Sequence, residues 1–401
     1  MMKAFFVVLL VELFLGGGGR LVEFGGVTLR MALFSLAVTL SVLVWMQHLR
    51  SGKNGWLAWG LVVTFAGIHA LGVLLGFIGG AALVDVWTDT RPLLYWLIAP
   101  FFAYMVSSSS NVRMSAALVA VSGSLLATAY LVTLFTIAAG YLDFTAFYVL
   151  LDETDEFNFR GETAFFYKGF LFLCIGLLFV LASGSSLRTV LALVVATAIV
   201  LTMTRGFILA STIAAVLLFI AMRDTRALAL ITMLGIVVLV WYVHFSNGLL
   251  ESLFSREESD AVRLDDMAFI AGNVDAVTLL VGHGLGIPIN TRLNIENSYL
   301  WIVWKLGLLG LSFWLFPLFI ALDLFRRIPW RSADYRLAAA FFFSIVLIYV
   351  QTATNPYLNN PIGLSFVILA LFSLSTISAP YRRGIHLARP RGRAGLAVRH
   401  V

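Results

Sequence analysis

Long apolar runs constrain the fold of this sequence more than any other feature. A helix needs about 20 mostly apolar residues to cross the roughly 30 Å hydrocarbon core of a bilayer. Runs that reach or approach this length lie at 3–15, 27–46, 56–79, 93–106, 114–139, 164–183, 188–203, 206–222, 227–245, 298–323, 336–351 and 361–379. Only 12% of the residues are charged, against roughly 25% in soluble domains. The sequence predicts an all-α polytopic membrane protein with about 12 transmembrane helices, of which two or three of the shorter ones could be re-entrant.

The runs also set the domain organisation. We expect one transmembrane domain over 1–381, with a large polar loop at 246–297 between the ninth and tenth helices, and a basic tail at 382–401. The run at 3–15 resembles a signal peptide, but the glycines at 16–19 follow it without a cleavage site, which predicts a retained first helix. The single cysteine, Cys174, excludes an intrachain disulfide and a thiolate metal cluster.

The charge distribution predicts the orientation, because cytoplasmic loops carry an excess of Lys and Arg. With both termini in the cytoplasm, most of the 27 basic residues fall inside and most of the 21 acidic residues fall outside. The loop at 246–297 is then extracytoplasmic. The basic tail is expected to lie on anionic lipid; it lacks aromatic partners and does not predict nucleic-acid binding.

Isolated arginines on the extracytoplasmic side are candidate ligand-binding residues. Arg205 lies between two apolar runs, where it could face a ligand or reach the headgroups. Arg256 and Arg263 are seven residues apart and would share one helix face, where Asp260 could pair with both. Arginine suits a bidentate grip on phosphate oxygens. Several arginines without a metal motif therefore predict a pyrophosphate-linked lipid as ligand.

A set of motifs spread over most of the chain resembles the O-antigen ligase and polymerase superfamily, which contains Wzy-type polymerases and their ligase relatives. The motifs are Glu12-Leu-Phe-Leu-Gly-Gly-Gly-Gly-Arg20, Thr202-Met-Thr-Arg-Gly-Phe-Ile-Leu-Ala210, Val262-Arg-Leu264, Val281-Gly-His-Gly-Leu-Gly286, Glu296-Asn-Ser-Tyr-Leu-Trp301, Leu306-Gly-Leu-Leu-Gly310 and Thr354-Asn-Pro-Tyr-Leu358. The resemblance implies an inverting, metal-independent glycosyltransferase of the GT-C type that needs no cofactor. It also implies that a glycan passes from undecaprenyl pyrophosphate to a hydroxyl of an acceptor glycan outside the cytoplasmic membrane.

The resemblance assigns roles to three residues. The two arginines of the family correspond to Arg205 and Arg263, which would hold the pyrophosphate and stabilise its charge as it leaves. Ligases of the family carry a histidine where this chain has Glu296, which weakens the ligase assignment and leaves the base open. Glu296 could be that base, or could interact with the dipole of the helix that follows it. His283 is the rival base.

We expect substrate contacts from Arg256, His283, Gly284, Asn297 and Tyr299. The turn of Gly282, Gly284, Gly286 and Pro288 could let the backbone approach a ligand, or could be a tight return into the next helix. The acidic cluster at 152–156 could coordinate a cation, although a solvated loop is the preferred interpretation. Glu12, His69, Lys168 and Lys305 could line a hydrophilic cavity, but only His69 lies far enough from a run end to require an interior partner.

The sequence thus favours an enzyme that polymerises lipid-linked oligosaccharide repeats of O antigen or an exopolysaccharide. Its partners would be the lipid-linked donor and acceptor, membrane lipid and a chain-length regulator. One alternative is a ligase that transfers the finished glycan to a lipid A core. Another is a transporter of lipid-linked glycan, which would carry internal repeats and charges near the bilayer midplane; the charges here crowd one loop on one face.

Overall fold

The computed structural model describes residues 1–43, 53–152, 154, 156–160, 164–184, 186–225 and 257–382. Within these ranges, five helices are long and apolar enough to cross a membrane. They are α4 (Lys53–Ile78), α7 (Ser109–Ala138), α11 (Arg205–Met222), α16 (Ser298–Arg326) and α18 (Pro361–Arg382). The prediction of a helical, multi-pass membrane protein is confirmed in this form, while the count of about 12 spans stays a prediction.

Shorter helices account for most of the other apolar runs. They are α1 (Met2–Leu15), α2 (Leu29–Leu43), α9 (Leu171–Ala182), α10 (Arg188–Leu201) and α17 (Tyr335–Gln351). The run at 93–106 divides into η1 (Leu94–Ile98) and α6 (Ala99–Met105), with Pro100 in the first turn of α6, where a missing N–H costs nothing. The predicted run at 227–245 lies outside the described residues.

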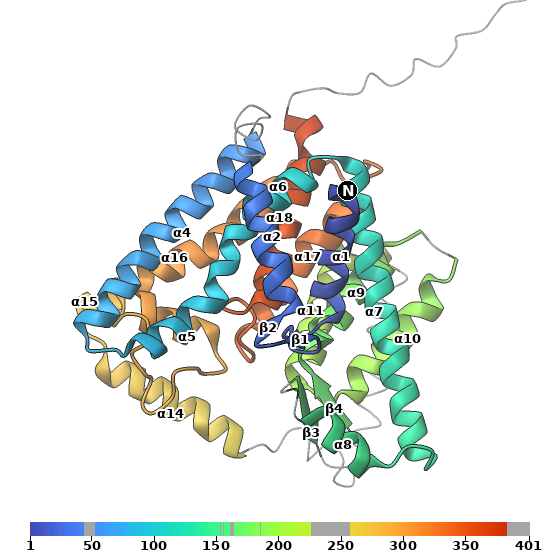
Figure 1. Cartoon of the computed structure of the whole chain (residues 1–401). Coiled ribbons are helices and arrows are strands. Elements are labelled where there is room, and N and C mark those ends of the chain that lie inside the picture. The colour runs from blue at the N-terminus through green and yellow to red at the C-terminus, as the bar shows by residue number, and fades with distance from the viewer. Residues whose placement is uncertain are drawn as a thin grey trace, which may run out of the picture.

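Four short helices lie between these elements: α5 (Leu83–Leu93), α8 (Phe144–Asp152), α14 (Glu257–Asn273) and α15 (Ala276–Val281). The last two belong to the large loop predicted at 246–297. In Figure 1, α14 lies across the end of the molecule that also holds α8 and the strands β3 and β4, away from the N-terminus.

Two antiparallel hairpins add strands to the predicted all-α fold. The first joins β1 (Glu23–Phe24) to β2 (Val27–Thr28) through Gly25 and Gly26, which both have positive φ as the tightest hairpin turns require. The second pairs β3 (Phe157–Arg160) with β4 (Ala164–Tyr167), and η2 (Lys168–Phe170) connects β4 to α9. The predicted helix at 164–183 therefore starts later, because its first four residues, an alanine and three aromatics, pair as a strand.

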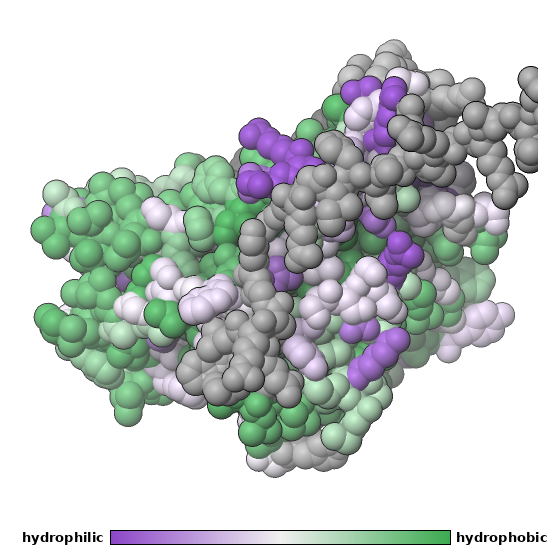
Figure 2. Space-filling model, turned by 90° about the horizontal axis from the view of Figure 1, so that it is seen from above, coloured by the Kyte–Doolittle hydropathy of each residue, from purple (hydrophilic) through white to green (hydrophobic). Residues whose placement is uncertain are grey.

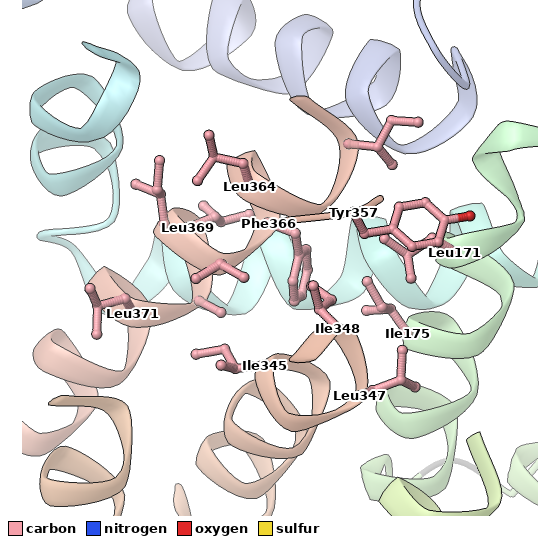
Figure 3. Packing of buried hydrophobic residues seen from close by; sticks show 14 of the residues in the cluster. Leu171, Ile175, Ile345, Leu347, Ile348, Tyr357, Leu364, Phe366, Leu369 and Leu371 are labelled. Atoms are coloured by element: carbon pink, nitrogen blue, oxygen red, sulfur yellow. The ribbon is translucent and has the colours of Figure 1, made fainter. Parts of the chain in front are cut away.

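The core lies where α17 and α18 pack against α9. Figure 3 shows aliphatic side chains of all three helices in contact around Phe366, with Tyr357 beside Leu171 and Ile175. Helix α9 also crosses α7 at two glycines: a Cβ on Gly123 would lie 2.8 Å from the Cα of Gly176. Such close backbone contact is typical of membrane helices, which lack a hydrophobic driving force between them and depend on close packing.

The outer surface matches a bilayer environment. Figure 2 views the end at which α1 begins; the left side and lower edge seen there are largely hydrophobic, and hydrophilic residues gather in the upper and right parts of the face. On α7, exposed Val121, Leu125, Val132 and Phe135 continue this apolar surface along the length of the helix. Lipid is the environment that such exposed apolar helices require.

Candidate active site

Arg205 is the first residue of α11, and the turn before it is tightly held. The chain passes from α10 into α11 within three residues, with Met203 in the left-handed region at φ 51°. The hydroxyl of Tyr130 in α7 donates to the carbonyl of Leu201 at 2.8 Å, which fixes the end of α10. A non-glycine residue at positive φ is uncommon and persists where surrounding contacts enforce it, so the backbone of Arg205 is well positioned.

The two residues after Arg205 pack against the segment that follows α17. A Cβ on Gly206 would lie 2.4 Å from Thr354 Oγ1, so only glycine fits there. Phe207 is buried and lies between two rings, with centroids 5.5 Å from Phe166 of β4 and 6.1 Å from Tyr357. The motif around Arg205 and the Thr354-Asn-Pro-Tyr-Leu motif are therefore neighbours in space.

The same segment after α17 binds the start of α16. The amide of Ser298 donates to the carbonyl of Thr352 at 3.1 Å, and its hydroxyl donates to Asn359 Oδ1 at 2.7 Å. Gly206, next to Arg205, and Ser298, two residues after Glu296, thus both contact residues 351–359. Three motifs that are far apart in the sequence converge at this end of the bundle.

Asn297 and Tyr299 have clear structural roles at the start of α16. Asn297 is the N-cap, and its Oδ1 accepts from the amides of Tyr299 at 3.0 Å and Leu300 at 3.2 Å. The hydroxyl of Tyr299 donates to the carbonyl of Tyr349 at 2.6 Å. Because these groups already bond protein atoms, the predicted substrate contacts of Asn297 and Tyr299 stay predictions.

Glu296 and Arg263 are in direct contact. Glu296 Oε2 lies 2.6 Å from Arg263 Nη2 and 3.0 Å from Nε, and the two side chains are 54% and 31% exposed. A second ion pair joins Arg292 to the nearly buried Asp266. Arg263 and Asp266 lie on α14, so two pairs hold this helix against residues 292–296. An exposed carboxylate beside a guanidinium is a group that an anionic ligand can reach and displace.

The sequence is similar to that of a curated protein over nearly the whole chain. A curated protein of Shigella flexneri, described as an O-antigen polymerase, is 30% identical over 387 residues, which are 94% of this chain and 96% of that protein. The chain belongs to the O-antigen polymerase family. No family model matches the sequence. The match confirms the resemblance that the motifs indicated.

In this O-antigen polymerase family member, His283 and Gly284 are engaged in packing. The His283 ring stacks on Trp304 with centroids 3.7 Å apart, and its Nε2 lies 3.2 Å from the carbonyl of Asn273. Gly284 has φ 100°, and a Cβ there would lie 2.0 Å from the amide nitrogen of Gly76 in α4. The contacts favour the tight return into the next helix over a ligand-binding turn, and the predicted substrate contacts of both residues stay predictions.

Two predicted residues cannot be placed. Arg256 lies outside the described residues, as does the side chain of Asp260. The expected pairing of Asp260 with Arg256 and Arg263 therefore stays a prediction. Arg263 has Glu296 as a partner, which the sequence did not indicate because the two residues are 33 positions apart.

The acidic cluster at 152–156 contains an unexpected buried carboxylate. Glu156 has no exposed surface; its oxygens accept from the amides of Gly18 at 2.5 Å and Arg20 at 2.9 Å. The glycine run after α1 thus wraps around this side chain, so for Glu156 the solvated-loop interpretation is wrong. Among the described residues, no group of three or more His, Cys, Asp and Glu is arranged to hold a metal ion.

Two of the charged residues inside the apolar runs, Glu12 and Lys305, form ion pairs. Glu12 and Arg30 form a 3.0 Å ion pair with side chains 8% and 3% exposed, and Lys305 pairs with Asp89. Of the two placements open to Glu12 and Lys305, the interior one is therefore favoured over the membrane interface. His69, for which an interior partner was expected, packs against Phe65 with ring centroids 5.1 Å apart, and its ring nitrogens have no hydrogen-bond partner within the described ranges.

Proposed function

We propose that this protein is a glycosyltransferase that polymerises undecaprenyl-pyrophosphate-linked oligosaccharide repeat units. The contact between Glu296 and Arg263, at the end of the bundle where Arg205 begins α11, carries this proposal. The name of the Shigella flexneri relative supports a polymerase over a ligase that transfers the glycan to a lipid A core. Ligases of the family carry a histidine at the position of Glu296, and this difference also favours a polymerase.

Arg205 and Arg263 are proposed to hold the pyrophosphate of the donor. Arg205 lies at the N-terminus of an 18-residue helix, where the helix dipole favours an anion. The N-cap Thr204 makes no side-chain cap hydrogen bond; its hydroxyl donates to the carbonyl of Thr202. A guanidinium together with this helix terminus suits a diphosphate leaving group.

The transfer itself is proposed as a single displacement with inversion. A hydroxyl oxygen of the acceptor glycan attacks the anomeric carbon of the donor glycan while the bond from that carbon to the pyrophosphate oxygen breaks. The electron pair of the breaking bond leaves with undecaprenyl pyrophosphate, whose charge the two arginines stabilise. The hydroxyl proton passes to Glu296 as general base.

The pairing of Glu296 with Arg263 suggests how the base becomes available. A pyrophosphate carries more negative charge than a carboxylate and binds a guanidinium in the same bidentate way. Donor binding at Arg263 would therefore replace Glu296, and the freed carboxylate would lie beside the reacting pyrophosphate. In this scheme the donor binds before the base can act.

The proposed setting is the periplasmic face of the bacterial inner membrane, with both termini in the cytoplasm. The excess of basic residues on the predicted cytoplasmic side supports this orientation. From the resemblance we also propose that the enzyme is of the GT-C type and independent of metal. Its further partner would be a chain-length regulator. The transporter alternative has less support, because the candidate groups lie at one end of the bundle.

Incubation of purified protein with a lipid-linked repeat unit tests the proposal. A ladder of products is expected, and Arg205→Ala and Arg263→Ala should shorten or abolish it. Arg327→Ala is the matched control, because Arg327 also pairs with a carboxylate, Asp323, on an exposed helix face but belongs to the far end of α16. A single transfer onto a lipid A core would indicate a ligase instead.

A further inference from the structure

Asp89 and Lys305 form a fully buried ion pair that is not part of the candidate active site described above. Lys305 Nζ lies 2.7 Å from Asp89 Oδ2, and neither side chain has exposed surface. Asp89 belongs to α5 and Lys305 to α16. A well-packed apolar pair of similar volume is often as stable as a buried ion pair, because the ions must be taken out of water. Stability alone therefore does not explain this pair.

Both charged groups also bond the backbone of residues 282–297, which we call the approach segment. The amide of Gly286 donates to Asp89 Oδ2 at 2.6 Å, and Lys305 Nζ donates to the carbonyl of Ile287 at 2.5 Å. Asp89 and Lys305 thus form one unit with two consecutive residues of the approach segment. The pair connects α5, α16 and this segment at one point.

Helix α16 is shaped to receive the approach segment. Its ladder is interrupted at Gly307, whose φ of 65° and ψ of −168° are not helical. In the turn before the kink, the carbonyls of Trp304 and Lys305 accept from the amides of His283 at 2.7 Å and Gly284 at 3.1 Å. The glycine turn and the ion pair therefore fix the first half of the approach segment onto α16.

The second half of the approach segment leads directly to the candidate base. The indole N–H of Trp301 donates to the carbonyl of Leu293 at 3.1 Å, and Ile295 is buried. Glu296 follows at the end of the segment and meets Arg263. A displacement at Gly286 and Ile287 would be passed along a short, bonded stretch of chain to Glu296.

We propose that Asp89 and Lys305 are positioning residues for glycan transfer. They hold the approach segment so that Glu296 lies against Arg263 and beside the start of α16. The catalytic part of this inference rests on the proposed function, whereas the placement of the segment can be measured without it. Misplacement of a reacting group by about 1 Å can cost on the order of a hundredfold in rate.

Two double variants separate backbone positioning from mere packing. Asp89→Asn with Lys305→Gln keeps an acceptor for Gly286 and a donor for Ile287, whereas Asp89→Leu with Lys305→Met fills the site with apolar groups but removes both bonds. We expect the first variant to polymerise at close to the wild-type rate. The second should fold and bind donor normally but turn over about 10- to 100-fold more slowly.

A distance measurement follows the approach segment directly. Spin labels are attached at Asn294→Cys and Tyr141→Cys, which replace exposed residues; the native Cys174 is buried and does not compete. The distance distribution should stay narrow in the Asn/Gln variant and broaden in the Leu/Met variant. If the wild-type protein formed no polymer, the proposed function would fail, and this readout would still test the positioning.

Two results would overturn the inference. One is a folded Leu/Met variant with wild-type turnover and an unchanged distance distribution. The other is an Asn/Gln variant as impaired as the Leu/Met variant, since charge rather than backbone bonding would then be essential. If the Leu/Met variant does not fold, Trp301→Phe removes the indole bond to Leu293 while it keeps an aromatic ring near Lys305. It should broaden the distribution; an unchanged distribution and rate would count against the inference.

Discussion

Replacement of Glu296 by glutamine should uncouple donor binding from transfer. A glutamine side chain keeps the shape of the glutamate but cannot accept a proton as a carboxylate does, and it no longer neutralises Arg263. The ion pair that is lost is half-exposed, with fractional exposures of 54% and 31%. Exposed pairs of this kind contribute about 0.2–1 kcal/mol. The variant should therefore fold with nearly wild-type stability.

The free energy of this ion pair also sets the expected change in donor affinity. If the pyrophosphate must displace Glu296 from Arg263, removal of the carboxylate returns at most the free energy of that pair. A free-energy change of about 1 kcal/mol corresponds to roughly a fivefold change in an equilibrium constant. Donor binding should thus tighten by up to about fivefold, while loss of a general base should slow transfer by about 10²- to 10⁴-fold.

Equilibrium binding of the lipid-linked donor and single-turnover transfer, measured on the same preparation, provide the assay. Asp265→Asn is the matched control, because Asp265 is an exposed carboxylate two positions from Arg263 on α14; both quantities should stay unchanged in it. Full transfer activity in Glu296→Gln would refute the base. Weaker donor binding with slow transfer would refute the displacement of Glu296 by the donor.

Three further predictions concern Arg205, the buried Glu156 and the membrane orientation. Arg205→Lys should raise the concentration of donor needed for half-maximal transfer, because lysine loses the bidentate grip; unchanged kinetics would remove Arg205 from the pyrophosphate site. Glu156→Gln should lower the free energy of unfolding by about 1–3 kcal/mol, since one of the two backbone amides that now donate to Glu156 would lose its acceptor; thermal unfolding in detergent measures this, and an unchanged midpoint would contradict it. A membrane-impermeant thiol reagent should label Asn294→Cys from the periplasm, and labelling only from the cytoplasmic side would reverse the orientation.

The helices were largely predictable because bilayer thickness translates directly into the length of an apolar run. One helix start was not predicted from the length of its apolar run. The residues at 164–167, of which the last three are aromatic, pair with Phe157–Arg160 as a hairpin, so α9 begins only at Leu171. The motifs likewise pointed to the candidate site, since Arg205, Arg263 and Glu296 lie in stretches that resemble the family. The relative of Shigella flexneri confirmed that resemblance over nearly the full length.

The partner of each buried or half-buried charge was not predictable. Glu296 meets Arg263 across 33 positions, Glu156 meets Gly18 across 138, and Lys305 of α16 meets Asp89 of the distant helix α5. Hydropathy reports the cost of placing each charge near hydrocarbon, but not which distant group relieves it. By itself, the sequence determined that the chain forms apolar helices suited to cross a membrane and carries its candidate site residues in polar stretches between them. Only the tertiary structure decided which of those groups face one another, because a charge in a low-dielectric interior is stabilised by whatever partner the fold brings to it.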